Sequence, residues 1–135
     1  MNQPLSISSI VSAQTDPETK KLINDILEAA DDRKADDINV LEVTEISYLA
    51  DFFILLSGFS RTQVRAISDS IEEKLELQWN RKPIRVEGKS DASWILMDYG
   101  DIIVNIFLPT EREFYNLEAF WGHKNRSALD ESATI

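Results

Sequence analysis

Cysteine is absent from the 135 residues of the chain. This absence excludes disulfide bonds, thiolate metal sites and cysteine nucleophiles, and it fits a reducing compartment. Histidine occurs only once, as His123, and no orienting partner is suggested near it, so histidine-based acid–base catalysis has no support. A Walker loop, a dinucleotide fingerprint and a zinc motif are missing as well. The usual signatures of nucleotide and metal chemistry are therefore not found.

Long apolar runs are also missing, since none approaches the roughly 18 residues that a membrane-spanning helix needs. The first residues read MNQPLSISSIVSAQ. They lack the basic and apolar regions of a secretory signal and the arginines of a mitochondrial transit peptide. We therefore expect a cytoplasmic globular protein. No internal repeat or second domain is visible, and the length suits a single core.

Basic residues are outnumbered, with 14 Lys and Arg against 24 Asp and Glu, which gives a formal net charge of -10. Such a chain repels phosphate backbones, and no segregated basic patch compensates, so direct nucleic-acid binding is disfavoured. An acidic surface suits a basic protein partner, because complementary potentials steer their encounter. The same charge could also serve only to keep the protein in solution. Composition alone leaves both interpretations open.

Hydrophobic periodicity predicts an α/β (α+β) fold in the order α-β-β-α-β-β-β-α, with a mixed five-stranded sheet flanked by helices. We expect tails at 1–14 and 123–135 around a single domain at 15–122. The passage from residue 51 to 86 is long enough for a right-handed parallel crossover. The predicted elements are a helix from 15, strands at 38–43 and 51–58, a helix at 60–79, a strand at 83–88, two strands within 93–107 and a helix at 110–122.

The stretch SWILMDYGDIIVNIF, residues 93–107, predicts a hairpin. With Tyr99 and Gly100 at the centre of a type II turn, Asp98 faces Asp101, and Trp94 faces Asn105. One side of this hairpin is a clean core face. The other side carries the remaining alternate residues, which are Trp94, Leu96, Ile103, Asn105 and Phe107, with the two aspartates at its tip.

Two interpretations of the paired aspartates remain. They could hold Mg²⁺ for nucleotidyl transfer, with Ser57–Gly58 as the remnant of a phosphate-binding turn and a third acid nearby. The spacing Asp-x-x-Asp is also common at ordinary turns. Alternatively, the aspartates belong to a protein-binding surface, because Trp94 and Tyr115 are residue types that are enriched in interface hot spots. For both aromatic residues, a place in the core is the competing explanation.

The order and spacing of several short motifs resemble the ribosomal silencing factor family, also called Iojap-like. The likeness covers about residues 17 to 122. It includes the segment ADFFILLSGFSRTQVRAISDSI and the later stretches VEGKSDASWILMDYGDIIVNIF and REFYNLEAFW. The matching motif residues are Glu87, Gly88, Ala92, Trp94, Asp98, Gly100, Asp101, Arg112, Tyr115, Leu117, Glu118 and Trp121. Asn105 departs from the family pattern, in which histidine is common.

This resemblance implies a translation repressor rather than an enzyme, with a nucleotidyltransferase-like topology that lacks catalytic residues, and without a cofactor or metal. It implies binding to the large ribosomal subunit through the basic protein numbered fourteen, a steric block to subunit joining, and a homodimer. The alternatives are a metal-dependent nucleotidyltransferase-like enzyme or nucleotide-binding protein, and a dimerisation module. The predicted partner-binding residues are Trp94, Asp98, Tyr99, Asp101, Arg112, Tyr115 and Glu118.

Overall fold

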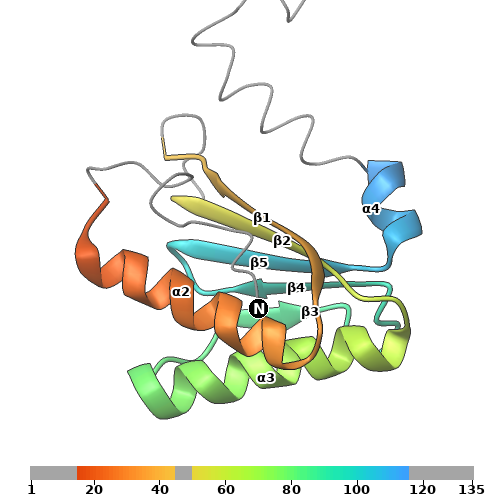
Figure 1. Ribbon diagram of the computed structural model, residues 1–135, viewed down its shortest axis with the longest axis horizontal. Helices are drawn as coiled ribbons and strands as arrows, with labels where there is room; N and C mark the ends of the chain where they lie inside the picture. Colours follow the sequence, from red (N-terminus) through yellow and green to blue (C-terminus); the bar gives the residue numbers. More distant parts are fainter. Residues whose placement is uncertain (1–14, 45–49, 116–135) are drawn as a thin grey trace, which may run out of the picture.

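A mixed α+β fold follows the predicted element order (Figure 1). The computed structural model describes residues 15–44 and 50–115. The predicted tails and the end of the last predicted helix lie outside these residues, so the domain limits stay a prediction. The elements are α2 (Pro17–Asp32), β1 (Asp36–Glu42), β2 (Phe52–Ser57), α3 (Arg61–Trp79), β3 (Arg85–Glu87), β4 (Trp94–Asp98), β5 (Ile102–Phe107) and α4 (Pro109–Tyr115).

The five strands form one sheet in the order β1-β2-β5-β4-β3, which confirms the predicted fold class. Only β2 and β5 pair in parallel among the described strands, and the other neighbours are antiparallel. All residues of β2 and β5 are buried, as expected for central strands that are covered on both sides. The predicted crossover from β2 through α3 does reach a strand of the same direction. That strand is β3 at the sheet edge, and β5 and β4 lie between β2 and β3.

Helices α2 and α3 lie side by side over one face of the sheet (Figure 1). The apolar stripe of α3 enters the main core together with alternate residues of every strand. α3 begins where the sequence predicts, because Ser60 Oγ accepts a hydrogen bond from the Gln63 backbone N–H at 3.0 Å. No helix in the described ranges 15–44 and 50–115 is long and apolar enough to cross a membrane.

The opposite side of the sheet, here called the second face, carries a smaller apolar cluster. Its buried members are Val43, Ala50, Phe53 and Ile103, and Leu41 and Leu96 pack against them half-buried. Helices α2 and α3 do not contribute to this cluster. The second face also carries Trp94, Asp98, Asn105 and Phe107, by alternation along β4 and β5. Predicted and observed faces of the hairpin therefore agree.

The predicted hairpin register is wrong by two residues. Asp98 pairs with Ile103 rather than Asp101, and Trp94 pairs with Phe107 rather than Asn105. The Tyr99 N–H donates to the Ile102 carbonyl at 2.9 Å, so Gly100 and Asp101 form the turn. Gly100 has φ +94°, as the first central residue of a type II′ turn requires. Because side chains alternate with period two, this shift leaves every strand residue on its predicted face.

Candidate functional site

Trp94 is held in a defined orientation on the second face. Its indole Nε1 donates a hydrogen bond to Asn105 Oδ1 at 3.0 Å. Its ring lies against Phe107, with centroids 4.9 Å apart and a tilt of 37°. Asn105 and Phe107 are buried, whereas Trp94 is half-buried. The unexpectedly polar Asn105 is thereby explained, since it occupies the diagonal position across the ladder and accepts the indole N–H.

The Asp98 carboxylate is bound within the chain rather than facing another acid. Its Oδ1 accepts from the Gly100 backbone N–H at 2.8 Å. Its Oδ2 lies 3.3 Å from Nε of Arg85, whose Nη1 also lies 3.1 Å from Glu87 Oε2. Arg85 on the edge strand β3 thus lies between two carboxylates of the second face.

Asp101 is bound in turn by the C-terminal end of α3. Arg81 Nη2 donates to Asp101 Oδ1 at 2.8 Å and to the Tyr99 carbonyl at 2.8 Å. The side chains of Arg81 and Asp101 are 31% and 39% exposed, and ion pairs at such exposure contribute about 1 kcal/mol or less. This ion pair therefore contributes little to the stability of the fold. No pattern in the sequence indicates that Arg81 and Arg85 neutralise these aspartates.

Tyr99 lies on the other side of the sheet from Trp94, in the main core. It is only 4% exposed, and its hydroxyl has no hydrogen-bond partner among the described residues. Burial raises the pKa of the Tyr99 hydroxyl far above its usual value, with a smaller contribution from the negative charge of Glu72. The sequence places Tyr99 in an exposed turn as a partner contact, whereas the structure gives it a core position.

Arg112 in α4 has an internal role as well, with 7% exposure. Its Nη1 donates to Ser57 Oγ at 2.9 Å, and its Nε lies 3.8 Å from Asp37 Oδ2. These contacts anchor α4 to the end of β2. Of the other predicted contacts, the side chain of Tyr115 and the whole of Glu118 lie outside what the structure describes.

The geometry gives no support to the nucleotidyltransferase alternative. That hypothesis requires Asp98, Asp101 and a third acid to converge beside Ser57–Gly58. Ser57 pairs with Phe107 at one end of β5, whereas Asp101 precedes the other end. Five residue steps of a strand separate these ends by about 17 Å. Within residues 15–44 and 50–115, no three side chains of His, Asp or Glu are grouped so that they could hold a metal ion.

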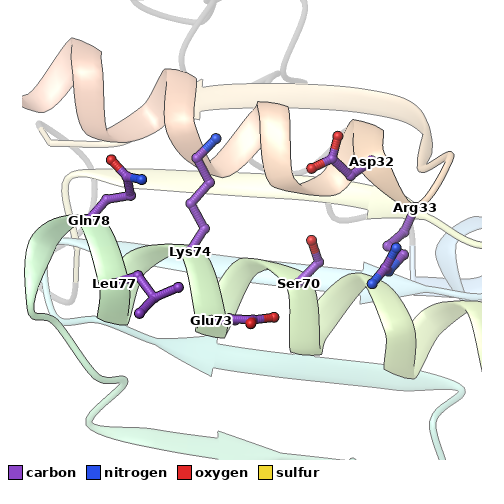
Figure 2. A pocket seen from close by; sticks show the side chains of 7 residues that line it. All are labelled: Asp32, Arg33, Ser70, Glu73, Lys74, Leu77 and Gln78. Carbon is purple, nitrogen blue, oxygen red and sulfur yellow. The ribbon is translucent and has the colours of Figure 1, made fainter.

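A polar groove of about 550 Å³ lies between α2 and α3 (Figure 2). Two of its polar side chains, Lys74 and Ser70, have internal partners. Lys74 Nζ lies 2.9 Å from Glu28 Oε1, and this hydrogen bond raises the pKa of Lys74. The Ser70 hydroxyl donates to the Ala29 carbonyl at 2.9 Å. The groove is formed by the helix layer, on the side of the sheet away from Trp94, and we assign no function to it.

Comparison with known proteins identifies the family. Residues 16–134 match the RsfS family model, described as "Ribosomal silencing factor during starvation". The ribosomal silencing factor RsfS of Bacillus subtilis is 36% identical over 111 residues, which cover 82% of this chain and 93% of that protein. The chloroplastic protein Iojap of maize is 40% identical over 113 residues, which cover 84% of this chain and 49% of the maize protein. The chain therefore spans about half the length of this plant relative.

A solved structure supports the same assignment. The crystal structure of a Chromobacterium violaceum protein superposes with a TM-score of 0.73 at 32% identity. The superposition covers 76% of this chain and 85% of that one. The resemblance of the motifs, the mixed sheet and these matches agree with one another. The chain belongs to the ribosomal silencing factor family.

Proposed function

We propose that this protein represses translation by binding the large ribosomal subunit through its basic protein numbered fourteen. The bound factor would occupy space that the small subunit needs, so that the subunits cannot join. Membership in a family of ribosomal silencing factors supports action on the ribosome and a regulatory rather than an enzymatic role. The protein partner and the steric mechanism come from the motif resemblance, and they are the parts that experiments must test.

The arrangement of Trp94 on the second face is the observation that carries this proposal. The indole N–H is satisfied within the chain by Asn105, and the ring is supported by Phe107. A side chain that is ordered before binding loses little conformational entropy on binding, so more of its contact energy appears as affinity. Tryptophan is also among the residue types that dominate interface energetics. Trp94 is therefore the anchor that we assign to the ribosome contact.

The charge of the protein supports a basic partner. Asp98 and Asp101 remain in the proposed surface, because their partners Arg85 and Arg81 are partly exposed and can give way to lysine or arginine of the partner. The net charge of -10 favours such an encounter at a distance.

The other predicted contacts divide into two groups. Tyr115 and Glu118 stay in the proposal on the strength of the family motif. We leave out Tyr99 and Arg112 as direct contacts, because both are buried. The homodimer and the cytoplasmic location stay predictions.

Sedimentation with separated ribosomal subunits tests the anchor. Wild type should sediment with the large subunit and not with the small one. Trp94→Ala should weaken this binding by about thirtyfold or more, as expected for a hot-spot residue. Trp79→Ala is the matched control, because Trp79 is also half-buried and donates its indole N–H, to Asp25 Oδ2 at 2.8 Å, but lies in the helix layer.

Both variants must first be shown to fold, by circular dichroism and thermal unfolding. If folded Trp94→Ala binds the large subunit as wild type does, the second face is not the contact. Crosslinking of bound wild type, followed by identification of the ribosomal protein attached, tests the protein numbered fourteen. Mixing of the two subunits with and without the factor then tests the block to joining.

A further inference from the structure

The loop Gly88–Ser93 joins β3 to β4 and leads directly into Trp94. Gly88 has φ +88°, and a Cβ at this position would lie 2.1 Å from the Trp94 carbonyl oxygen, so only glycine fits. Ala92 also has a positive φ of 61° and is fully buried, and its N–H donates to the Gly88 carbonyl at 2.7 Å. The loop is therefore a tightly closed turn that rests against the backbone of Trp94.

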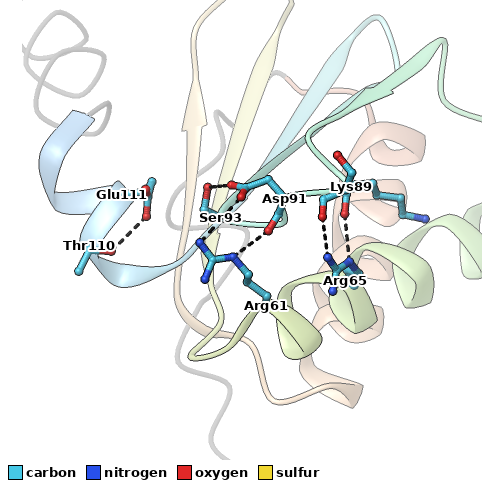
Figure 3. Close-up of polar contacts among 8 residues, drawn as sticks. Arg61, Arg65, Lys89, Asp91, Ser93, Thr110 and Glu111 are labelled. Carbon is cyan, nitrogen blue, oxygen red and sulfur yellow. Dashed lines mark hydrogen bonds and ion pairs between the residues drawn. The ribbon is translucent and has the colours of Figure 1, made fainter.

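Two arginines of α3 hold this loop through its carbonyl oxygens (Figure 3). Arg65 donates from Nε to the Lys89 carbonyl at 3.0 Å and from Nη2 to the Ser90 carbonyl at 2.7 Å. Arg61 Nε donates to the Asp91 carbonyl at 2.9 Å. Three consecutive carbonyl groups are thus bound by charged donors, and the planar fork of Arg65 fixes the direction of two of them.

The loop is also tied at both of its ends. The Lys89 ammonium lies 2.6 Å from Asp69 Oδ1 on α3, and this hydrogen bond raises the pKa of Lys89. At the other end, the Ser93 carbonyl accepts from the Leu108 N–H at 2.9 Å, just beyond β5. The loop therefore connects the helix layer on one side of the sheet with the start of β4, where Trp94 stands on the second face.

We propose that Arg61 and Arg65 are positioning residues for the ribosome contact. They hold the loop Gly88–Ser93 so that the backbone of Trp94 directs its ring onto Phe107 and its N–H to Asn105. This inference rests on the proposed function, because Trp94 is the assigned anchor. Arg65 is half-buried and Arg61 is exposed, and both side chains donate to carbonyl groups of the loop, through which they would act on Trp94.

A double substitution, Arg61→Lys with Arg65→Lys, separates positioning from simple charge. Lysine keeps the positive charge but lacks the planar fork that binds two carbonyls at once. We expect this variant to bind the large subunit about tenfold more weakly, a smaller loss than removal of the anchor itself. Lys74→Ala is the matched control, because it removes a cross-element ion pair from the same helix, away from the loop.

The indole N–H signals in ¹H–¹⁵N spectra of the free protein give a readout that does not need ribosomes. The Trp94 signal should shift or broaden in the double lysine variant, while the Trp79 signal serves as the internal reference. Thermal unfolding should show that the variant remains folded. A Trp94 signal at its wild-type position together with wild-type binding would overturn the inference.

Two further outcomes are informative. Wild-type binding by the lysine variant but weak binding by Arg61→Ala with Arg65→Ala would mean a direct charge contact, which also overturns positioning. Failure of the proposed function can be distinguished from failure of this inference, because Trp94→Ala would then bind the large subunit as wild type does. In that case the arginines would have no binding to support, whatever the indole signal does.

Discussion

Replacing Tyr99 by phenylalanine should stabilise the protein, although the sequence predicts Tyr99 as a partner contact. The hydroxyl is removed from water without a hydrogen bond to any described group, and the ring is 4% exposed. A buried hydroxyl without a partner costs about 1–3 kcal/mol, and phenylalanine keeps the ring while removing that group. We therefore expect the free energy of unfolding to rise by about 1 kcal/mol or more at pH 7.

The same substitution should matter more in alkali. Burial raises the pKa of Tyr99 in the folded state above its usual value near 10. The folded protein then holds this proton more tightly than the unfolded chain does. Below about pH 10 the hydroxyl keeps its proton in both states, so its ionisation takes nothing from the free energy of unfolding. Above that pH the unfolded chain ionises first, and the free energy of unfolding falls by about 1.4 kcal/mol per pH unit. At pH 11 the advantage of Tyr99→Phe should therefore grow by about 1.4 kcal/mol.

Urea unfolding of both proteins at pH 7, 9 and 11 measures this difference. Lys74 and Lys89 have raised pKa values too, so both proteins lose stability in alkali through them, and this loss cancels in the comparison. A constant difference between the two proteins from pH 7 to 11 would refute burial of the hydroxyl. A less stable Tyr99→Phe at pH 7 would mean that the hydroxyl has a hydrogen-bond partner. Unchanged sedimentation of Tyr99→Phe with large subunits is expected, because Tyr99 is not on the second face.

Two other substitutions test the surroundings of Trp94. Gly88→Ala should lower the free energy of unfolding by about 2–4 kcal/mol in urea titrations, because it combines a positive φ with a steric clash on the Trp94 carbonyl. A Cβ at Gly58 would have its nearest neighbours 3.1–3.3 Å away, so Gly58→Ala should lower the free energy of unfolding by clearly less than Gly88→Ala. Equal losses of stability in the two variants would contradict this explanation. Asn105→Leu removes the acceptor of the Trp94 indole N–H and should lower the free energy of unfolding by about 1 kcal/mol. Asn105→His can keep an acceptor for this N–H, through a ring nitrogen. If leucine and histidine unfold at the same urea concentration, the indole hydrogen bond contributes no stability.

The faces of the hairpin could be predicted from the sequence, but its register could not. Alternation along residues 93–107 determines which side chains share a face, and a shift of two residues leaves that pattern unchanged. The register depends on the turn, and Gly100 suits either the third position of a type II turn or the second position of a type II′ turn. The ladder shows the second arrangement. Asp101 then leaves the ladder, and the two aspartates do not face each other.

The polar contacts around the site could not be predicted from sequence patterns, for a different reason. Arg81 and Asp101 are 20 residues apart, and Arg65 reaches carbonyl groups 24 and 25 residues away. Such contacts depend on how whole elements pack, and neither periodicity nor local motifs encode that packing. Alternation alone would have placed Tyr99 on the core face with Ile95 and Met97. The turn chemistry around Gly100 instead favoured an exposed position.

The place of β5 at the centre of the sheet has a consequence for synthesis of the chain. β2 is complete at Ser57, but its parallel neighbour β5 is complete only at Phe107, 50 residues later (107 − 57). At about 5–20 residues per second, translation takes roughly 2.5–10 s to cover this interval. During that time β1 is the one sheet neighbour of the apolar segment FFILLS, among the described strands, that has already been made, so its other edge remains open. The nascent chain must therefore carry an unprotected sheet edge until nearly all of the domain has been translated.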